Sequence, residues 1–352
     1  MRILYFSRGY TPHDHRFLSA ITEAGHEAVF LRLNPDSATE TRRLPKGVKP
    51  VRGSLRTVIS QVKPDLVHAG PLPDCGYQAA KSGFHPLVQM SWGSDILWEV
   101  KRIATSRSRV RFALQHADAV IGDCETVKHA AIKFGTPADR IVKFPWGVDL
   151  TQFKPAGKKG GIRAELGWQN NFVFLHLRAW DPLYDPLTVA KAFVDAARQN
   201  LDLRLLMPGN GSLSSELRKT FAQAGLRNRV HLPGKISYVD LPAYYRAADV
   251  YLSAAQSDGS SVSLLEALAS GLPALVSDIP SNREWVETGK QGWLFPPKKP
   301  AVLRELILQA TGSDKMTNMA RQARKVAESR ADWNRNKLAL YKAYELAVRI
   351  NR

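Results

Sequence analysis

Two acidic side chains flank a serine-rich turn in the second half of the sequence. Asp258 lies eight positions before Glu266, in the stretch SDGSSVSLLEALASG. The pattern predicts a strand, a glycine turn and a helix, and the first N–H groups of a helix attract an anion. A phosphate would fit at Ser261 to Ser263. Glu266 could then accept hydrogen bonds from the two hydroxyls of a ribose, and Asp258 would face the group that the phosphates carry. A capped helix with a solvated glutamate is the structural alternative, and spacing alone does not decide between the two.

Arg178 provides a cation at the end of another predicted strand. Its guanidinium can hold a diphosphate through two parallel hydrogen bonds. A surface ion pair with Asp181 or Asp185 is the alternative. Gly209 begins a Gly-Asn-Gly turn that lets a ligand approach the backbone, although this signal is weak alone. Together with the serine turn, these residues suit a nucleotide diphosphate that carries a polyhydroxylated group.

Loops of the first half offer further candidates. In the loop 7–17, Gly9 allows close approach to the backbone, and a helix begins near Asp14. In the loop 91–100, Gly93 precedes a helix start between two tryptophans. Helix caps and core aromatic residues would explain both loops without a ligand. The candidates on this side are His13, Asp14, His68, Trp92, Ser94 and Asp95.

No metal site is predicted. The pair His13-x-His15 has no third ligand, and Cys75 and Cys124 lie in unrelated contexts. Two such cysteines also make a structural disulfide unexpected and fit a reducing cytoplasm.

Short apolar runs alternate with helical patterns along the whole chain. This alternation predicts parallel strands with helices on both faces of a sheet, in two consecutive doubly wound α/β domains. A proline-, glycine- and lysine-rich stretch at 145–161 is the predicted linker, and 332–349 is a predicted amphipathic helix that must pack on a domain already formed. The predicted strands are 2–7, 27–33, 65–70, 86–91, 119–123, 171–178, 203–209, 229–234, 250–254 and 273–277.

The charge of the chain favours anionic partners. Its 352 residues include 50 Lys and Arg against 32 Asp and Glu, a formal charge of +18. No nucleic-acid-binding motif accompanies this charge, so nucleic acid is not the expected partner. The stretch 101–112, KRIATSRSRVRF, is either a helix that faces an anionic membrane or a solvated basic face. No apolar run is long enough for a signal peptide or a membrane span. We therefore expect a cytoplasmic protein that is at most attached peripherally to a membrane.

Two long segments resemble the retaining glycosyltransferases of family 4. Residues 117–155 are similar to the family's segment that closes the first domain, and residues 209–278 to its nucleotide-sugar domain. The resemblance implies the GT-B fold, with two Rossmann-like domains facing across a cleft. It implies a first domain of residues 1–150, completed by a helix at 332–352, and a second domain of residues 151–331.

The resemblance also implies roles for single residues. Glu266 matches the glutamate that holds the donor ribose, and Asp258 replaces the glutamate that lies by the donor sugar. Arg178 matches the diphosphate-binding arginine, and with Asp258 it is expected to be catalytic. The full set of expected donor-binding residues is Gly9, Tyr10, Arg178, Gly209, Lys235, Ile236, Asp258, Gly259, Ser260, Ser261, Val262 and Glu266.

Besides Asp258, this sequence departs from the family pattern at three places. Tyr184 stands near the position of a second cation, a lysine, and Trp92 replaces a histidine that commonly faces the donor sugar. Arg8-Gly9-Tyr10 replaces a double glycine in the first loop.

The resemblance implies transfer of a sugar, with retention, from a nucleotide diphosphate such as UDP or GDP to a glycan or lipid-linked acceptor, without a cofactor or metal. A nucleotide-sugar-binding protein with weakened or lost transfer is the alternative.

Overall fold

A computed structural model describes residues 1–156 and 161–351. The chain forms two compact units, Met1–Pro145 with Asn334–Arg352, and Trp146–Trp333. Within the predicted linker, Val148 and Phe153 are fully buried in the core of the second unit, whereas residues 157–160 lie outside the described residues. The second unit therefore begins before residue 151, because Val148 also exchanges backbone hydrogen bonds with Ala331 and Trp333.

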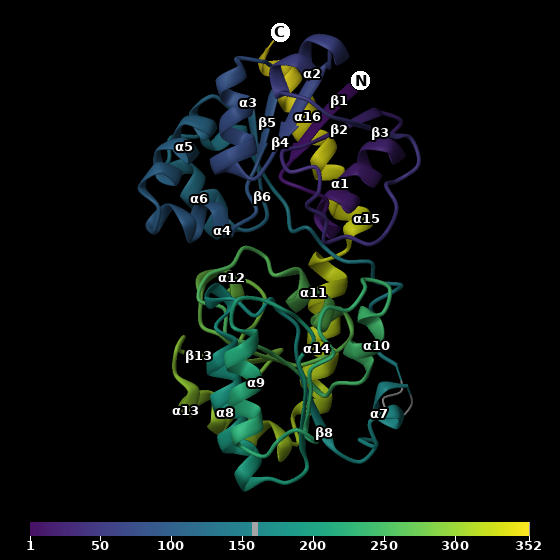
Figure 1. The fold of residues 1–352 in the computed structure, drawn as a ribbon, viewed down its shortest axis with the longest axis vertical. Coiled ribbons are helices and arrows are strands. Elements are labelled where there is room, and N and C mark those ends of the chain that lie inside the picture. Colours follow the sequence, from purple (N-terminus) through teal and green to yellow (C-terminus); the bar gives the residue numbers. More distant parts are fainter. Residues whose placement is uncertain (157–160, 352) are drawn as a thin grey trace. The chain divides into compact units, whose positions relative to one another are not determined.

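The first unit is built on a sheet of seven parallel strands in the order β3-β2-β1-β4-β5-β6-β7 (Figure 1). Its strands are β1 Arg2–Ser7, β2 Glu27–Arg32, β3 Val48–Val51, β4 Leu66–Ala69, β5 Leu87–Met90, β6 Ala119–Gly122 and β7 Ile141–Lys143. Its helices are α1 Pro12–Glu23, α2 Leu55–Val62, α3 Tyr77–Ser82, α4 Ser94–Leu97, α5 Ala104–Gln115 and α6 Glu125–Lys133.

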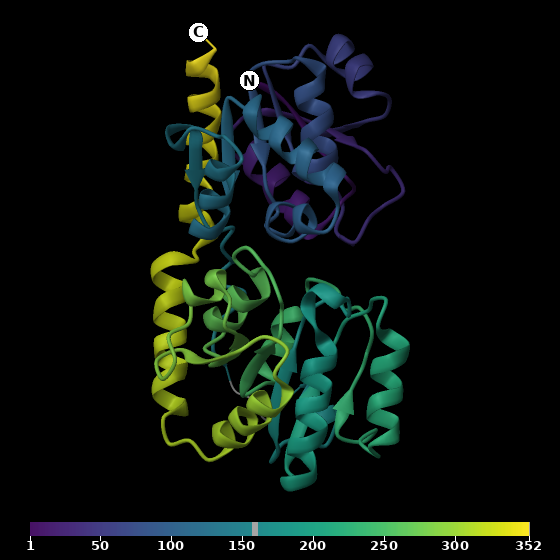
Figure 2. The same ribbon diagram turned by 90° about the vertical axis from the view of Figure 1, so that its left-hand side faces the viewer.

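The end of the chain completes this first unit. The predicted helix at 332–349 is two helices, α15 Trp333–Asn336 and α16 Leu338–Ile350, with a turn at Lys337 between them. The apolar face of α16 packs against β5, β6 and β7 (Figures 1 and 2). Leu340, Ala343 and Tyr344 are buried there, which is the docking that an amphipathic helix without a following strand requires.

The second unit has six parallel strands in the order β10-β9-β8-β11-β12-β13. Its strands are β8 Phe172–His176, β9 Leu203–Leu206, β10 Val230–His231, β11 Val250–Ser253, β12 Ala274–Ser277 and β13 Gly292–Phe295. Its helices are α7 Ile162–Glu165, α8 Pro186–Gln199, α9 Ser214–Gln223, α10 Leu241–Arg246, α11 Val262–Ala269, α12 Pro280–Arg283, α13 Pro300–Thr311 and α14 Met316–Arg330.

Alternate residues of the central strands of this second sheet enter two different cores. On β8, Phe174 belongs to one apolar cluster, and Val173 and Leu175 belong to the other. Because helices cover both faces, these strands are predominantly apolar, as parallel strands usually are. The prediction of two parallel-sheet α/β domains is confirmed.

Both sheets have the doubly wound order, which fixes where a ligand binds. The strand order reverses between β1 and β4 in the first sheet and between β8 and β11 in the second. Chain segments that leave these strand pairs at their carboxyl ends diverge, and doubly wound sheets bind their ligands at that point.

Candidate functional site

An ion pair joins the two loops at the reversal point of the second sheet. Arg178 follows β8 and Asp258 follows β11, and their Nη2 and Oδ2 atoms are 2.6 Å apart. The Nη1 of Arg178 donates to the hydroxyl of Ser261 and, over 3.2 Å, to that of Ser263. Four of the polar side chains around the predicted turn thus converge at one place. Asp181 and Asp185 serve elsewhere: Asp181 accepts from Ser212, and Asp185 caps α8.

Tyr184 lies against the plane of the Arg178 guanidinium. The Cζ of Arg178 is 4.1 Å from the centre of the Tyr184 ring, a cation–π contact. Tyr184 ends a short 3₁₀ turn, Pro182–Tyr184, and Gln256 on the β11 loop bonds to that turn through the carbonyls of Pro182 and Leu183. The aromatic residue near the expected position of a lysine therefore holds the arginine rather than adding a second charge.

The surroundings of this ion pair have two opposite effects on its charged forms: burial disfavours them, and neighbouring groups stabilise them. The side chains of Arg178 and Asp258 are only 10% and 15% exposed. Burial raises the pKa of the Asp258 carboxyl, and Arg178 and the Gly259 backbone offset part of that rise. Burial lowers the pKa of Arg178, but Asp258 outweighs this effect and keeps the guanidinium charged.

Serine side chains organise the start of α11. Ser261 is the N-cap and accepts from the Leu264 N–H, and Ser263 shares a 2.7 Å hydrogen bond with the Tyr251 hydroxyl. The Trp285 indole donates to the hydroxyl of Ser260. Serine hydroxyls suit this position because they cap the helix while leaving the backbone of the turn uncovered by bulky side chains.

Glu266 is buried, with 3% of its surface exposed, so the solvated glutamate considered above is wrong. Its Oε2 accepts a 2.8 Å hydrogen bond from the hydroxyl of Tyr245, on α10. Burial and then Glu266 raise the pKa of Tyr245 well above its ordinary value, so the phenol stays a donor. Sequence reasoning missed Tyr245 and Tyr251, whose rings belong to an apolar core while their hydroxyls reach the polar network.

The other expected donor-binding residues of this unit lie on the neighbouring loops. A Cβ on Gly209 would lie 2.6 Å from Trp180 Nε1 and 2.8 Å from the Arg178 carbonyl oxygen, so packing alone requires a glycine there. Lys235 is exposed and Ile236 is half-buried on the loop after β10.

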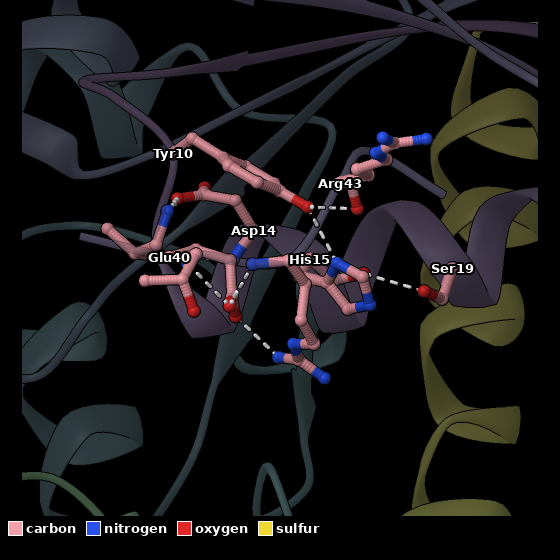
Figure 3. A network of polar contacts seen from close by, with 9 residues as sticks. Tyr10, Asp14, His15, Ser19, Glu40 and Arg43 are labelled. Atoms are coloured by element: carbon pink, nitrogen blue, oxygen red, sulfur yellow. Dashed lines mark hydrogen bonds and ion pairs between the residues drawn. The ribbon is translucent and has the colours of Figure 1, made fainter. Parts of the chain in front are cut away.

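In the first unit, the loop after β1 is enclosed by the segment 37–43. A Cβ on Gly9 would lie 2.4 Å from the carbonyl oxygen of Ser37. The hydroxyl of Tyr10 lies 2.6 Å from His15 Nδ1 and donates to the Arg43 carbonyl (Figure 3). Burial raises the pKa of Tyr10 to about 12. Gly9 and Tyr10, expected at the donor, thus have packing roles within their own unit.

Three candidates of the first unit form hydrogen bonds within that unit. Asp14 forms a capping box with Thr11 and accepts from the Tyr5 hydroxyl. Asp95 accepts from the Ser91 hydroxyl and from the N–H groups of Leu72, Trp92 and Ile96. His68 is fully buried and shares a 2.9 Å hydrogen bond with Tyr344 of α16. The two carboxylates are satisfied locally because their loops offer unpaired backbone groups or a nearby hydroxyl, whereas the buried Nε2 of His68 has no hydrogen-bond partner among the described residues.

The remaining candidates are less enclosed. His13, Trp92 and Ser94 are half-buried, and the rings of His13 and Trp92 meet edge to face with centroids 5.6 Å apart. Within residues 1–156 and 161–351, no group of three His, Cys, Asp or Glu side chains is placed to hold a metal ion.

Each unit matches a family model. Residues 2–124 match the model described as glycosyl transferase 4-like, and residues 159–326 match the model described as glycosyl transferases group 1. Together the two matched segments cover most of the chain. Arg178, Asp258 and Glu266 all lie in the segment that matches the group 1 model.

Solved structures of other proteins have the same fold. The crystal structure of Anabaena HepE in complex with UDP-glucose has a TM-score of 0.85, with 21% identity over 98% of this chain and 99% of that one. Sucrose-phosphate synthase from Thermosynechococcus elongatus has a TM-score of 0.79, with 16% identity over 98% of each chain. These likenesses establish the GT-B fold.

A curated relative is more similar over part of its length. The UDP-Gal:alpha-D-GlcNAc-diphosphoundecaprenol alpha-1,3-galactosyltransferase of Escherichia coli is 33% identical over 162 residues, which are 44% of this chain and 41% of that protein. The chain spans between about a fifth and about a half of the length of the curated relatives that it matches.

Proposed function

We propose that the protein is a retaining glycosyltransferase that moves a sugar from a UDP-sugar to an acceptor. The observation that carries the proposal is that Arg178, on the loop after β8, bonds to Ser261 and Ser263 at the start of α11, the helix that also carries the buried Glu266. UDP is favoured as the nucleotide because UDP appears in the names of the E. coli relative and of the Streptococcus gordonii UDP-N-acetylglucosamine–peptide N-acetylglucosaminyltransferase GtfA subunit.

The diphosphate would bind at Arg178 and the start of α11. As the bond to the sugar breaks, negative charge grows on the departing diphosphate, and a cation and hydrogen-bond donors fixed in a buried site stabilise it. Each such group lowers the activation free energy by about 2.7–4 kcal/mol. Arg178 is held by Tyr184 and the serine hydroxyls, so little reorganisation is needed at the moment of reaction.

Glu266 would hold the ribose. A carboxylate can accept from both hydroxyls of a vicinal diol, and the Tyr245 hydroxyl orients this one. Retention follows the family pattern, in which the acceptor attacks from the face that the diphosphate leaves and the diphosphate assists in removing the acceptor proton. We propose that this reaction needs neither cofactor nor metal, because Arg178 and the α11 N-terminus supply the positive potential. Full activity in EDTA would agree with this, and activity restored only by magnesium would contradict it.

A ligand panel tests the donor assignment. Thermal-shift measurements with UDP-, GDP-, ADP- and TDP-sugars should show the largest stabilisation with a UDP-sugar, since a ligand that binds the folded state raises the melting temperature. Transfer to an acceptor, or slow hydrolysis of the donor, should follow with the same nucleotide. Binding without either reaction would support the nucleotide-sugar-binding alternative instead.

A glycan or lipid-linked acceptor is the acceptor class that we propose, with the protein acting at the cytoplasmic face of a membrane. Among the described residues no helix is long and apolar enough to cross a membrane. The segment 101–112 covers the end of a short 3₁₀ turn and most of α5, and its Lys101, Arg102, Arg107 and Arg109 are exposed beside Ile103, which is 47% exposed. Names of relatives include diphosphoundecaprenol and diacylglycerol.

Charge reversal tests this surface. Replacement of Lys101, Arg102, Arg107 and Arg109 by glutamate should abolish binding to phosphatidylglycerol vesicles, because each basic residue near such a surface adds about 1 kcal/mol. Binding of the UDP-sugar is the control and should not change. Unaffected vesicle binding would remove this surface as the membrane contact.

A further inference from the structure

Asp258 is bonded to the same groups that the proposed function assigns to a phosphate of the donor. Its carboxylate is paired with the Arg178 guanidinium at 2.6 Å and receives hydrogen bonds from the Gly259 backbone and the Ser261 side chain. A guanidinium, a backbone N–H and a serine hydroxyl together form a typical phosphate-binding set. The loop therefore brings its own anion to the place where a second anion is expected.

The charge balance at this place makes the two anions competitors. The Asp258 carboxylate carries one negative charge, and Arg178 is the cation that directly contacts it. Near the expected position of a further cation stands Tyr184, whose neutral ring stacks on Arg178. Like charges that share one cation in a poorly solvated site repel each other strongly.

We propose that Asp258 is an internal counter-ion of Arg178, which a donor displaces on binding and which returns to Arg178 to expel the nucleoside diphosphate product. The inference rests on the proposed function and deepens it. With a nucleotide sugar, the displaced carboxylate can accept hydrogen bonds from sugar hydroxyls. With the bare diphosphate it gains no such bonds and faces an additional negative charge. Asp258 therefore sets the preference for the donor over the product.

Asp258→Asn is the variant that tests the exchange, because it removes the charge and nearly preserves the shape. Calorimetric titration should show UDP bound about 10-fold more tightly than by the wild type, with a smaller gain for the UDP-sugar and no change for uridine. Asp195→Asn is the matched control. It makes the same change in net charge on α8, where Asp195 pairs with Arg198 on the surface, and should leave all three affinities unchanged.

Other outcomes separate the inference from the proposed function. Unchanged or weaker UDP binding by folded Asp258→Asn, with normal binding by the wild type, would overturn the counter-ion role and leave the proposed function intact. No binding of UDP or UDP-sugar by the wild type would overturn both. Asp258→Glu covers the case in which Asp258→Asn does not fold. It retains the charge, so UDP affinity should stay within about threefold of the wild type, and a 10-fold gain would contradict the counter-ion role.

Discussion

Each of the two sheets carries an arginine–aspartate pair across its reversal point, and the two pairs differ in their surroundings. In the first unit Arg8, after β1, pairs with Asp74, after β4, and Glu99 lies 3.7 Å from the same guanidinium. In the second unit Arg178, after β8, pairs with Asp258, after β11. The Arg8 side chain is 44% exposed, whereas that of Arg178 is 10% exposed.

The difference shows that the sheet topology determines where an ion pair lies, but not whether the pair takes part in chemistry. Arg178 is stacked on Tyr184 and bonded to serine hydroxyls at a helix start, so its charge acts in a poorly solvated place where electrostatic interactions are strong. Water reaches Arg8, and two carboxylates already surround it. We therefore expect the pair in the second unit to matter for chemistry and the pair in the first unit to matter little.

Arg178→Ala should have the largest effect. Loss of the cation that faces the departing diphosphate should lower the turnover number by about 100- to 1,000-fold. Initial rates of transfer at saturating donor would measure this. Arg163→Ala is the matched control, because Arg163 is also a buried arginine and pairs with Asp249, which directly precedes β11 at the opposite end of that strand. It should lower the melting temperature while the folded protein still binds UDP. A turnover number unchanged in Arg178→Ala would remove the distinction between the two pairs.

Glu266→Ala should have the next largest effect and acts on binding. Hydrogen bonds to a charged group contribute about 1.5–3 kcal/mol, so UDP affinity should fall by about 10- to 100-fold. Calorimetric titration with UDP measures the change. Glu216→Ala, at an exposed acid in the first turn of α9, should bind UDP like the wild type. Equal affinities in both variants would contradict the ribose assignment.

Low pH should destabilise both units through one buried histidine in each. Burial lowers the pKa of His68 and that of His176 to about 3, against an ordinary value of about 6.5. The unfolded chain then binds more protons than the folded protein between these values, so stability is lost as the pH falls below about 6.5. Each histidine should cost about 1.4 kcal/mol at pH 5.5.

Urea unfolding at pH 5.5 and pH 8 measures this loss. His68→Leu should reduce the pH dependence of the first unit only, and His176→Leu that of the second only. A pH dependence that neither variant reduces would show that other groups control it.

Arg8→Ala should have the smallest effect. Exposed ion pairs contribute about 0.2–1 kcal/mol, so the free energy of unfolding should change by less than about 1 kcal/mol, and UDP affinity should not change. Chemical unfolding and UDP titration test both statements. A large loss of transfer with unchanged stability and UDP affinity would instead make Arg8 a contact of the acceptor. The two pairs would then differ in the substrate that each binds, and both would matter for transfer.

The alternation of apolar runs was sufficient to predict both sheets, because a parallel strand buried on both faces is apolar throughout. Three strands escaped this signal. Strand β3 contains Pro50 and is partly exposed at the edge of its sheet, and β7 has only three residues. Strand β13, GWLF, begins with a glycine.

The polar site was predictable in part. Arg178 ends one predicted strand and Asp258 follows another by four positions, which marks both as residues at the carboxyl end of a sheet. Tyr245 and Tyr251 carry no such mark, because a tyrosine whose ring belongs to the core has the same pattern whether or not its hydroxyl is used. Asp14 and Asp95 show the converse limit: a carboxylate at a helix start reads the same whether it caps its own loop or meets a ligand.

The hydrogen bond between His68 and Tyr344 has a consequence for biosynthesis. His68 lies on β4 in the first part of the chain, and its partner Tyr344 lies on α16, 276 positions later. The ribosome therefore makes the entire second unit before α16 can cover β5, β6 and β7. During that interval the second unit can fold as a continuous segment, while the first exposes an apolar face to chaperones and to other nascent chains.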